Sequence, residues 1–172
     1  HRRMKPLAPL LLALAAAGAT SGCGLQPLYA GGGSGAIARG LSAVEVPPIE
    51  GRAGWLVRDA LRQELGQGAE GAGSGAAYRL DVLLDEQLQG LGVLNNETVG
   101  RERYTLRARY QLIDLASGDI VLDATTGSDV GIDVVSSEYA TIAAEQTAQE
   151  NLAREVADQI ATRLALTLRR NR

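Results

Sequence analysis

The chain is poor in the residues that most often carry enzyme chemistry and covalent cross-links. Its 172 residues include one histidine, His1, one cysteine, Cys23, one lysine, Lys5, and no phenylalanine. Without imidazole after residue 1 and thiol after residue 23, the usual Ser-His-Asp and Cys-His nucleophiles and His/Cys zinc sites are excluded there. A single cysteine also excludes an intrachain disulfide, so the domain must be held by its own core. The roughly 150 residues that follow Cys23 are enough for one core.

Positive charge is also scarce once the first residues are set aside. The whole chain has 17 basic and 20 acidic residues, a formal net charge of −3. Arg2, Arg3 and Lys5 precede Cys23 and no acid does, so the remainder carries 14 basic and 20 acidic residues, a net charge of −6. Such a chain lacks the broad positive field that phosphate backbones require, and we expect no nucleic-acid partner.

The first 22 residues have the pattern of a secretion signal. A positive start precedes an apolar run from Leu7 to Ala17, which is too short for a transmembrane helix of about 20 residues. Small residues then lead through Gly22 to Cys23, which resembles the bacterial lipobox. The resemblance implies cleavage between Gly22 and Cys23, with diacylglycerol on the sulfur and an acyl chain on the nitrogen of Cys23. Such an anchor is strong enough for stable membrane attachment.

Two residues beside Cys23 bear on this interpretation. Thr20 stands where the lipobox usually has leucine, which leaves open an ordinary secretory cleavage with Cys23 as a free thiol. Gly24 stands where aspartate marks inner-membrane retention in enterobacterial lipoproteins, so Gly24 favours the outer membrane. Residues 23–40, with the glycine run over 31–35, are expected to be a lipidated start and a flexible tether. We expect no cofactor beyond the lipid on Cys23.

Residues 41–172 predict one α+β domain. Apolar alternation indicates strands, and four-residue apolar spacing indicates two amphipathic helices, the second with an N-cap at Ser136 or Ser137. A turn at Ala116–Asp119 joins the last two strands, and glycine-rich stretches over 66–75 and 90–100 are expected to be loops. The β-α-β-β-β-α order predicts a two-layer sandwich, with a small, mostly antiparallel or mixed four-stranded sheet and two helices on one face. The expected strands cover 41–49, 78–84, 104–112 and about 120–130, and the expected helices about 54–65 and 139–168.

Several short motifs occur in an order that is similar to one known family. They are Gly-Leu-Gln-Pro-Leu-Tyr directly after Cys23, Pro48-Ile49, Arg52, Arg58-Asp59-Ala60-Leu61, Tyr110-Gln111-Leu112-Ile113-Asp114, Ser117-Gly118 and an Ala/Glu-rich final helix. This order resembles the alphaproteobacterial lipopolysaccharide-assembly lipoprotein family, LptE, over nearly the whole chain. The resemblance implies a non-enzymatic outer-membrane lipoprotein that assists assembly of the β-barrel LptD and plugs it. It also implies lipopolysaccharide binding and transport to the outer leaflet.

Four arginines form the only dense basic group in the acidic domain. Arg101, Arg103, Arg107 and Arg109 share one parity, so in a strand they project from one sheet face. Because arginine suits phosphate and lipid A carries phosphates, one hypothesis is that this row contacts lipopolysaccharide. The alternative is a solvated face paired with acids such as Asp81, Asp85 and Asp123 across the sheet.

Other residues are interpreted without a specific role. Trp55, the only tryptophan, is expected to lie in the core, the alternative being an anchor at a partner surface. The acids of the strands lack the EF-hand spacing, and we expect no metal site.

Two other functions stay open at this point. An auxiliary lipoprotein of an envelope ABC transporter would also be a small tethered α/β domain. A lipoprotein hydrolase is disfavoured, since no histidine or lysine follows Cys23.

Overall fold

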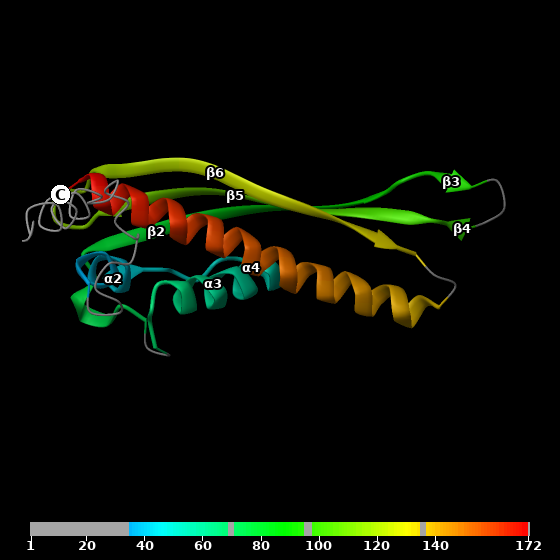
Figure 1. Cartoon of the computed structure of the whole chain (residues 1–172), viewed down its shortest axis with the longest axis horizontal. Helices are drawn as coiled ribbons and strands as arrows, with labels where there is room; N and C mark the ends of the chain where they lie inside the picture. The colour runs from blue at the N-terminus through cyan, green and yellow to red at the C-terminus, as the bar shows by residue number, and fades with distance from the viewer. Residues whose placement is uncertain (1–34, 69–70, 95–97, 135–136, 172) are drawn as a thin grey trace, which may run out of the picture.

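A four-stranded mixed sheet forms one layer of the protein (Figure 1). The computed structural model describes residues 35–68, 71–94, 98–134 and 137–171. The strand order is β1-β2-β5-β6, in which β1 is parallel to β2 and the other neighbours are antiparallel. The strands are β1 (Val44–Glu45), β2 (Tyr78–Gly90), β5 (Arg101–Asp114) and β6 (Ile120–Asp133).

The helices form the second layer, on one face of the sheet (Figure 1). The long helix α4 (Glu138–Arg170) crosses this face, with α3 (Gly51–Glu64) beside it and the short α2 (Ala36–Ser42) near its C-terminal end. The prediction of a two-layer α+β sandwich is therefore confirmed.

Alternation along β5 explains why one face is buried. Tyr104, Leu106, Ala108, Tyr110 and Leu112 are all buried and contribute to one hydrophobic core with the helices. The odd-numbered residues between them face away from the helices. The predicted alternation is confirmed, and the strand runs two to three residues farther at each end than the pattern indicated.

The ends of α4 follow the expected capping chemistry. The Ser137 hydroxyl accepts a hydrogen bond from the Ala140 N–H at 3.4 Å, which confirms the N-cap prediction for Ser137. Ser136 lies outside the described residues. The buried residues of α4 extend from Ala148 to Leu168, so the first ten residues of the helix contribute none of them. The sheet-facing core thus ends near Ala148, and the N-terminal third of α4 extends past it.

The two hairpin connections differ in how well they were predicted. The β5–β6 turn is confirmed, because Gly118 has φ of 79° and the Asp114 carboxylate accepts from the Ala116 N–H at 2.8 Å. The loop predicted over 90–100 instead contains a two-stranded ribbon of β3 (Val93–Leu94) and β4 (Thr98–Val99). The 66–75 stretch connects α3 to β2 and includes the 3₁₀ helix η3 (Gly73–Gly75).

The strand predicted over 41–49 is wrong over most of its length. Residues 36–42 form α2, only Val44 and Glu45 pair with β2, and Pro47 and Pro48 carry the chain away from the sheet. Proline supplies no N–H to a ladder, which explains the early end. Leu41 is buried because α2 packs against the C-terminal part of α4, so packed structure begins before the expected limit at residue 41.

Candidate functional site

The outer face of the sheet carries the arginine row, defined here as Arg101, Arg103, Arg107 and Arg109 of β5. All four are exposed on the face turned away from the helices, as their shared parity predicted. Because β5 lies between β2 and β6, each arginine can reach side chains on two neighbouring strands.

Acids of β6 pair with three members of the row. Arg101 lies 3.1 Å from the Asp133 carboxylate, which is its direct cross-strand neighbour. The other two pairs are diagonal to the register, with Arg103 to Asp129 at 3.5 Å and Arg109 to Asp123 at 3.2 Å. The side chains in these pairs keep between 42 % and 75 % of their surface exposed, so solvent screens the charges and each pair contributes little to stability.

Asp123 is the most strongly held of these acids. Its carboxylate accepts hydrogen bonds from Gln111 at 2.8 Å and from Arg109 at 3.2 Å. These hydrogen bonds lower the pKa of Asp123 below its ordinary value. The carboxylate therefore stays ionised, and keeps Arg109 paired, into moderately acidic solution.

Arg107 differs from the other three arginines. Within the described residues, no carboxylate lies within the 4 Å ion-pair limit of its guanidinium, although Asp85 is its neighbour in the β2 register. On the other side Arg107 faces Gly127, where the Cβ of any larger residue would come 3.0 Å from the Arg107 Cγ. A glycine at this place leaves room for the Arg107 side chain, and makes it the most available cation of the row.

The alternative prediction, that acids across the sheet pair with the arginine row, is thus partly confirmed, but most of the acids differ from those expected. Asp123 pairs with the row as predicted, whereas Asp81 pairs with Arg79 at 3.0 Å and Asp85 accepts from Gln87 at 3.2 Å. Beside the row, six residues of β2 and β5 line a shallow hollow of about 330 Å³. They are Asp81, Val82, Leu83, Arg109, Tyr110 and Gln111.

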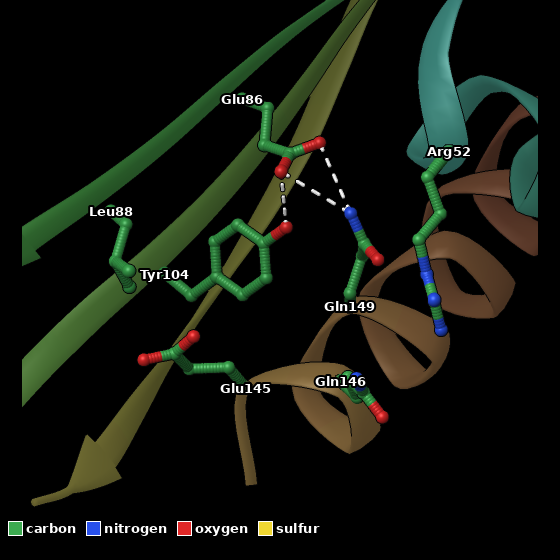
Figure 2. A pocket seen from close by; sticks show the side chains of 7 residues that line it. All are labelled: Arg52, Glu86, Leu88, Tyr104, Glu145, Gln146 and Gln149. Carbon is green, nitrogen blue, oxygen red and sulfur yellow. Dashed lines mark hydrogen bonds between the residues drawn. The ribbon is translucent and has the colours of Figure 1, made fainter. Parts of the chain in front are cut away.

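A second polar group lies on the inner face, between the sheet and α4 (Figure 2). The Tyr104 hydroxyl donates to Glu86 Oε1, and the Gln149 amide donates to both Glu86 oxygens at 3.2 and 3.3 Å. These residues belong to β5, β2 and α4, so their hydrogen bonds tie the sheet to the helix where the apolar core ends. We call Glu86, Tyr104 and Gln149 the polar latch.

A cleft of about 260 Å³ opens beside the polar latch (Figure 2). Arg52 of α3 lies at one side of it, and its guanidinium is 3.8 Å from Glu150. Sequence reasoning missed this site. A signal was present, because Glu86 interrupts an apolar alternation and Gln149 lies in a buried stripe. The lining residues are Arg52, Glu86, Leu88, Tyr104, Glu145, Gln146 and Gln149.

Burial raises the pKa of Tyr104, and the hydrogen bond to the Glu86 carboxylate raises it further. Burial also raises the pKa of Tyr110. Both phenols are favoured in the neutral form when folded. Their contribution to stability is therefore full below pH about 10, the pKa of an unfolded tyrosine, and is lost progressively as the pH rises from there through their raised folded pKa. An absorbance titration at 295 nm should show late-ionising phenols, and Tyr104→Phe should remove one of them. Loss of an early phenol instead would contradict this assignment.

The prediction that Trp55 lies in the core is wrong. Its side chain is 64 % exposed, whereas Ala53, Val57 and Leu61 of the same helix are buried. Trp55 lies two residues before Val57, which places it on the opposite side of the helix.

Gly22 and Cys23 lie outside the described residues. In the described part of the chain, no helix is long and apolar enough to cross a membrane, and no group of three potential metal-ligating side chains was found.

The protein is thus a small two-layer domain with a charged, open outer sheet face and a polar cleft between the sheet and α4. The chain belongs to the LptE lipopolysaccharide-assembly family, whose model matches residues 41–164. No curated protein matches it in sequence.

Solved structures share this fold. A candidate lipoprotein from Caulobacter crescentus CB15 is 34 % identical with a TM-score of 0.64, over 77 % of this chain and 95 % of that one. A minor lipoprotein from Acinetobacter baumannii is 17 % identical with a TM-score of 0.52, over 72 % of this chain and 88 % of that one. Lipoprotein B from Nitrosomonas europaea is 12 % identical with a TM-score of 0.51, over 69 % and 77 %. The last two show likeness of fold alone.

Proposed function

We propose that this chain is a non-enzymatic outer-membrane lipoprotein, anchored through Cys23, that assists and plugs the β-barrel LptD and binds lipopolysaccharide on its way to the outer leaflet. The observation that carries the proposal is the LptE family match over residues 41–164. The lipobox-like sequence ending at Gly22-Cys23 and the 34 % identical candidate lipoprotein support the anchor.

A detergent pull-down of the full lipoprotein tests the partner. The proposal expects a stoichiometric outer-membrane barrel of the LptD type, identified by mass spectrometry, and a weakened permeability barrier on depletion. Cys23→Ser should abolish labelling by radioactive palmitate. Recovery of an inner-membrane transport complex instead of a barrel would indicate the ABC-transporter alternative.

The arginine row supports the lipopolysaccharide part of the proposal. Its members are forked cations on an open surface, and Arg107 lacks an ion pair among the described residues. Phosphate oxygens can accept two hydrogen bonds from one guanidinium, and such charge-assisted contacts are stronger than neutral ones. The β6 acids compete with phosphate for the other three arginines, so these would exchange partners when lipid A binds.

Replacing Arg107 with glutamine should weaken binding to lipid A about tenfold, because one charge-assisted contact is lost while the ion pairs remain. Replacing all four arginines with serine should weaken it about a hundredfold or more. Both variants should bind dephosphorylated lipid A almost as the wild type does. Fluorescence titration of each variant with both lipids measures the difference.

A matched control is Arg169→Gln, which removes one positive charge from the exposed C-terminal turn of α4. Asp129→Asn provides the opposite test, because it releases Arg103 and should leave lipid A binding equal or tighter. Equal loss for phosphorylated and dephosphorylated lipid in the fourfold variant would rule out phosphate recognition by the row.

A further inference from the structure

The β2 strand has an open edge along most of its length. On that side, β1 pairs only with Tyr78 and Arg79 before the chain departs at Pro47 and Pro48. In the described part of the chain, no strand pairs with the remainder of this edge, from Leu80 to Gly90. A strand added to the open part of this edge would therefore lie in line with β1, beyond Glu45.

The register shows which backbone groups of β2 point toward its open edge. The Leu91 N–H donates to the Arg101 carbonyl at 2.7 Å, and the Leu115 N–H donates to the Ala77 carbonyl at 3.0 Å. In an antiparallel pair, hydrogen-bonded residues alternate, so the odd-numbered residues of β2 bond to β5 and the even-numbered ones point to the edge. The Tyr78 N–H, which donates to the Ala43 carbonyl at 3.2 Å, follows this rule. The parallel register with β1 places the Leu80 N–H on the Glu45 carbonyl. The edge groups left without a ladder partner therefore begin at the Leu80 carbonyl and continue with the N–H and C=O groups of Val82, Leu84, Glu86 and Leu88.

Apolar side chains flank the open edge on both faces. Leu83 is 72 % exposed on the outer face, and Leu88 is 47 % exposed where it lines the cleft. Beyond the cleft, the N-terminal third of α4 exposes Tyr139 (84 %) and Ile142 (45 %). Their spacing to Gln146 places these residues on the side of α4 that lines the cleft.

The opposite edge of the sheet is less suited to strand addition. On β6, Gly127 and Gly131 alternate with Asp123, Asp129 and Asp133, and all three acids are held by arginines of β5. Glycine weakens a strand. In contrast, β2 has no glycine before Gly90 and keeps an unbroken register with β5 from Tyr78 to Gly90.

On the helix side of the β2 edge, carboxylates outnumber cations. Glu86 lies on the strand and Glu145 lines the cleft across from it, whereas Asp85 on the outer face has Arg107 as its register neighbour. Glu102, the neighbour of Gly90 in the register, has a buried Oε2 that accepts no hydrogen bond from the described residues. Such an oxygen is stabilised by a cation brought close to it. The sole cation lining the cleft, Arg52, already lies 3.8 Å from Glu150.

We propose that the β2 edge receives an extended segment of a protein partner, in which apolar and basic side chains alternate. The segment adds a strand next to Val82–Gly90. Its basic side chains point to the helix side and meet Glu86 and Glu145 of the cleft, and its apolar side chains lie on the outer face beside Leu83. This inference rests on the part of the proposed function that gives the chain a protein partner, and not on lipopolysaccharide binding.

Other occupants fit the edge less well. The chain's own residues 24–34 carry no charge and include Pro27, so they cannot satisfy the carboxylates. A second copy would bring an acidic β2 against an acidic β2. A lipid acyl chain could enter the cleft but leaves the edge N–H and C=O groups without partners.

Site-specific photo-crosslinking in cells tests the occupant. The full-length lipoprotein carries p-benzoylphenylalanine at Leu83, with Thr125 of β6 as the matched site on the other edge. We expect an adduct at Leu83, but not at Thr125, with a partner peptide that alternates apolar and basic residues. An adduct with residues 24–34, a second copy or lipid, or no adduct at all, would overturn the proposal.

Backbone recognition is tested by comparing Leu88→Pro with Leu88→Ala. Both remove the leucine side chain, but only proline removes an edge N–H, so it should lower the Leu83 adduct yield about tenfold relative to alanine. Thr125→Pro removes an N–H from the β6 edge and should leave the yield unchanged. Circular dichroism verifies that each variant is folded. Equal yields for Leu88→Pro and Leu88→Ala would show that no strand is added at this edge.

The two proposals can fail separately. If the Leu83 adduct is an alternating basic segment of a protein other than a barrel, the β2 inference stands and the LptD partnership fails. If the pull-down recovers the barrel while the adduct is absent, the partnership stands and the β2 edge is not its docking site.

Discussion

Replacing Gly54 with alanine is expected to destabilise the protein by about 2 kcal/mol, although the same change favours an isolated helix by about 1 kcal/mol. Gly54 lies inside α3 and is buried. A Cβ there would come within 2.5 Å of the Ile49 carbonyl oxygen and 2.7 Å of its carbon. Because the obstacle is backbone, it cannot rotate away, and α3 must shift from the segment that follows Pro47-Pro48.

Thermal unfolding followed by circular dichroism measures this effect. A loss of about 2 kcal/mol lowers Tm by roughly 4–8 °C in a domain of this size. Gly40→Ala is the matched control, because its Cβ would meet only the end of the Leu168 side chain, at 3.3 Å. The control should change stability by less than about 1 kcal/mol in either direction. A more stable Gly54→Ala protein would show that the helix approaches Ile49 less closely than the structure indicates.

The spacing of apolar residues along the chain was enough to predict the main elements of this fold. Two-residue alternation located β5 and its buried face, and four-residue spacing located α4 almost to its ends. These patterns survive in the structure because each element buries one continuous face against the other layer. The turn at Gly118 was predictable for a different reason, since positive φ there favours glycine.

The start of the domain could not be predicted in the same way. Residues 41–49 alternate like a strand, but β1 has only two residues, and Leu41 is buried by α2 rather than by a sheet neighbour. A short apolar stretch fits either environment, and tertiary packing decided between them. Trp55 was misplaced because its size favoured the core, although its position two residues from Val57 placed it outside the buried stripe.

In the candidate sites, too, only the features that follow from a local sequence pattern could be predicted. The shared exposed face of the arginine row followed from parity, whereas its partners followed from the β6 register, which no local pattern reveals. Glu86 and Gln149 are 63 residues apart along the chain, and only the crossing of α4 over the sheet brings them together. The open edge of β2 was also hidden, because it depends on where β1 ends.

Leu164→Ala in α4 is expected to destabilise the protein by about 3 kcal/mol, the other large effect. The Leu164 side chain has no exposed surface and lies in the core shared by α4, α3 and the sheet. Its removal loses the burial of the side chain and leaves a cavity. With Cys23 as the only cysteine, no disulfide offsets the loss, and about 3 kcal/mol is a large part of the usual 5–15 kcal/mol of a domain.

Leu166→Ala is the matched control for this change, because it removes the same atoms from the same helix two residues away. Leu166 is 41 % exposed, so its replacement should cost less than about 1 kcal/mol. Urea unfolding of both variants measures the difference, with unchanged slopes showing that the unfolded states are alike. Equal losses would mean that α4 packs through a different face. A large loss confined to Leu164 would show that α4 stabilises the domain through the face that packs in the helix–sheet core.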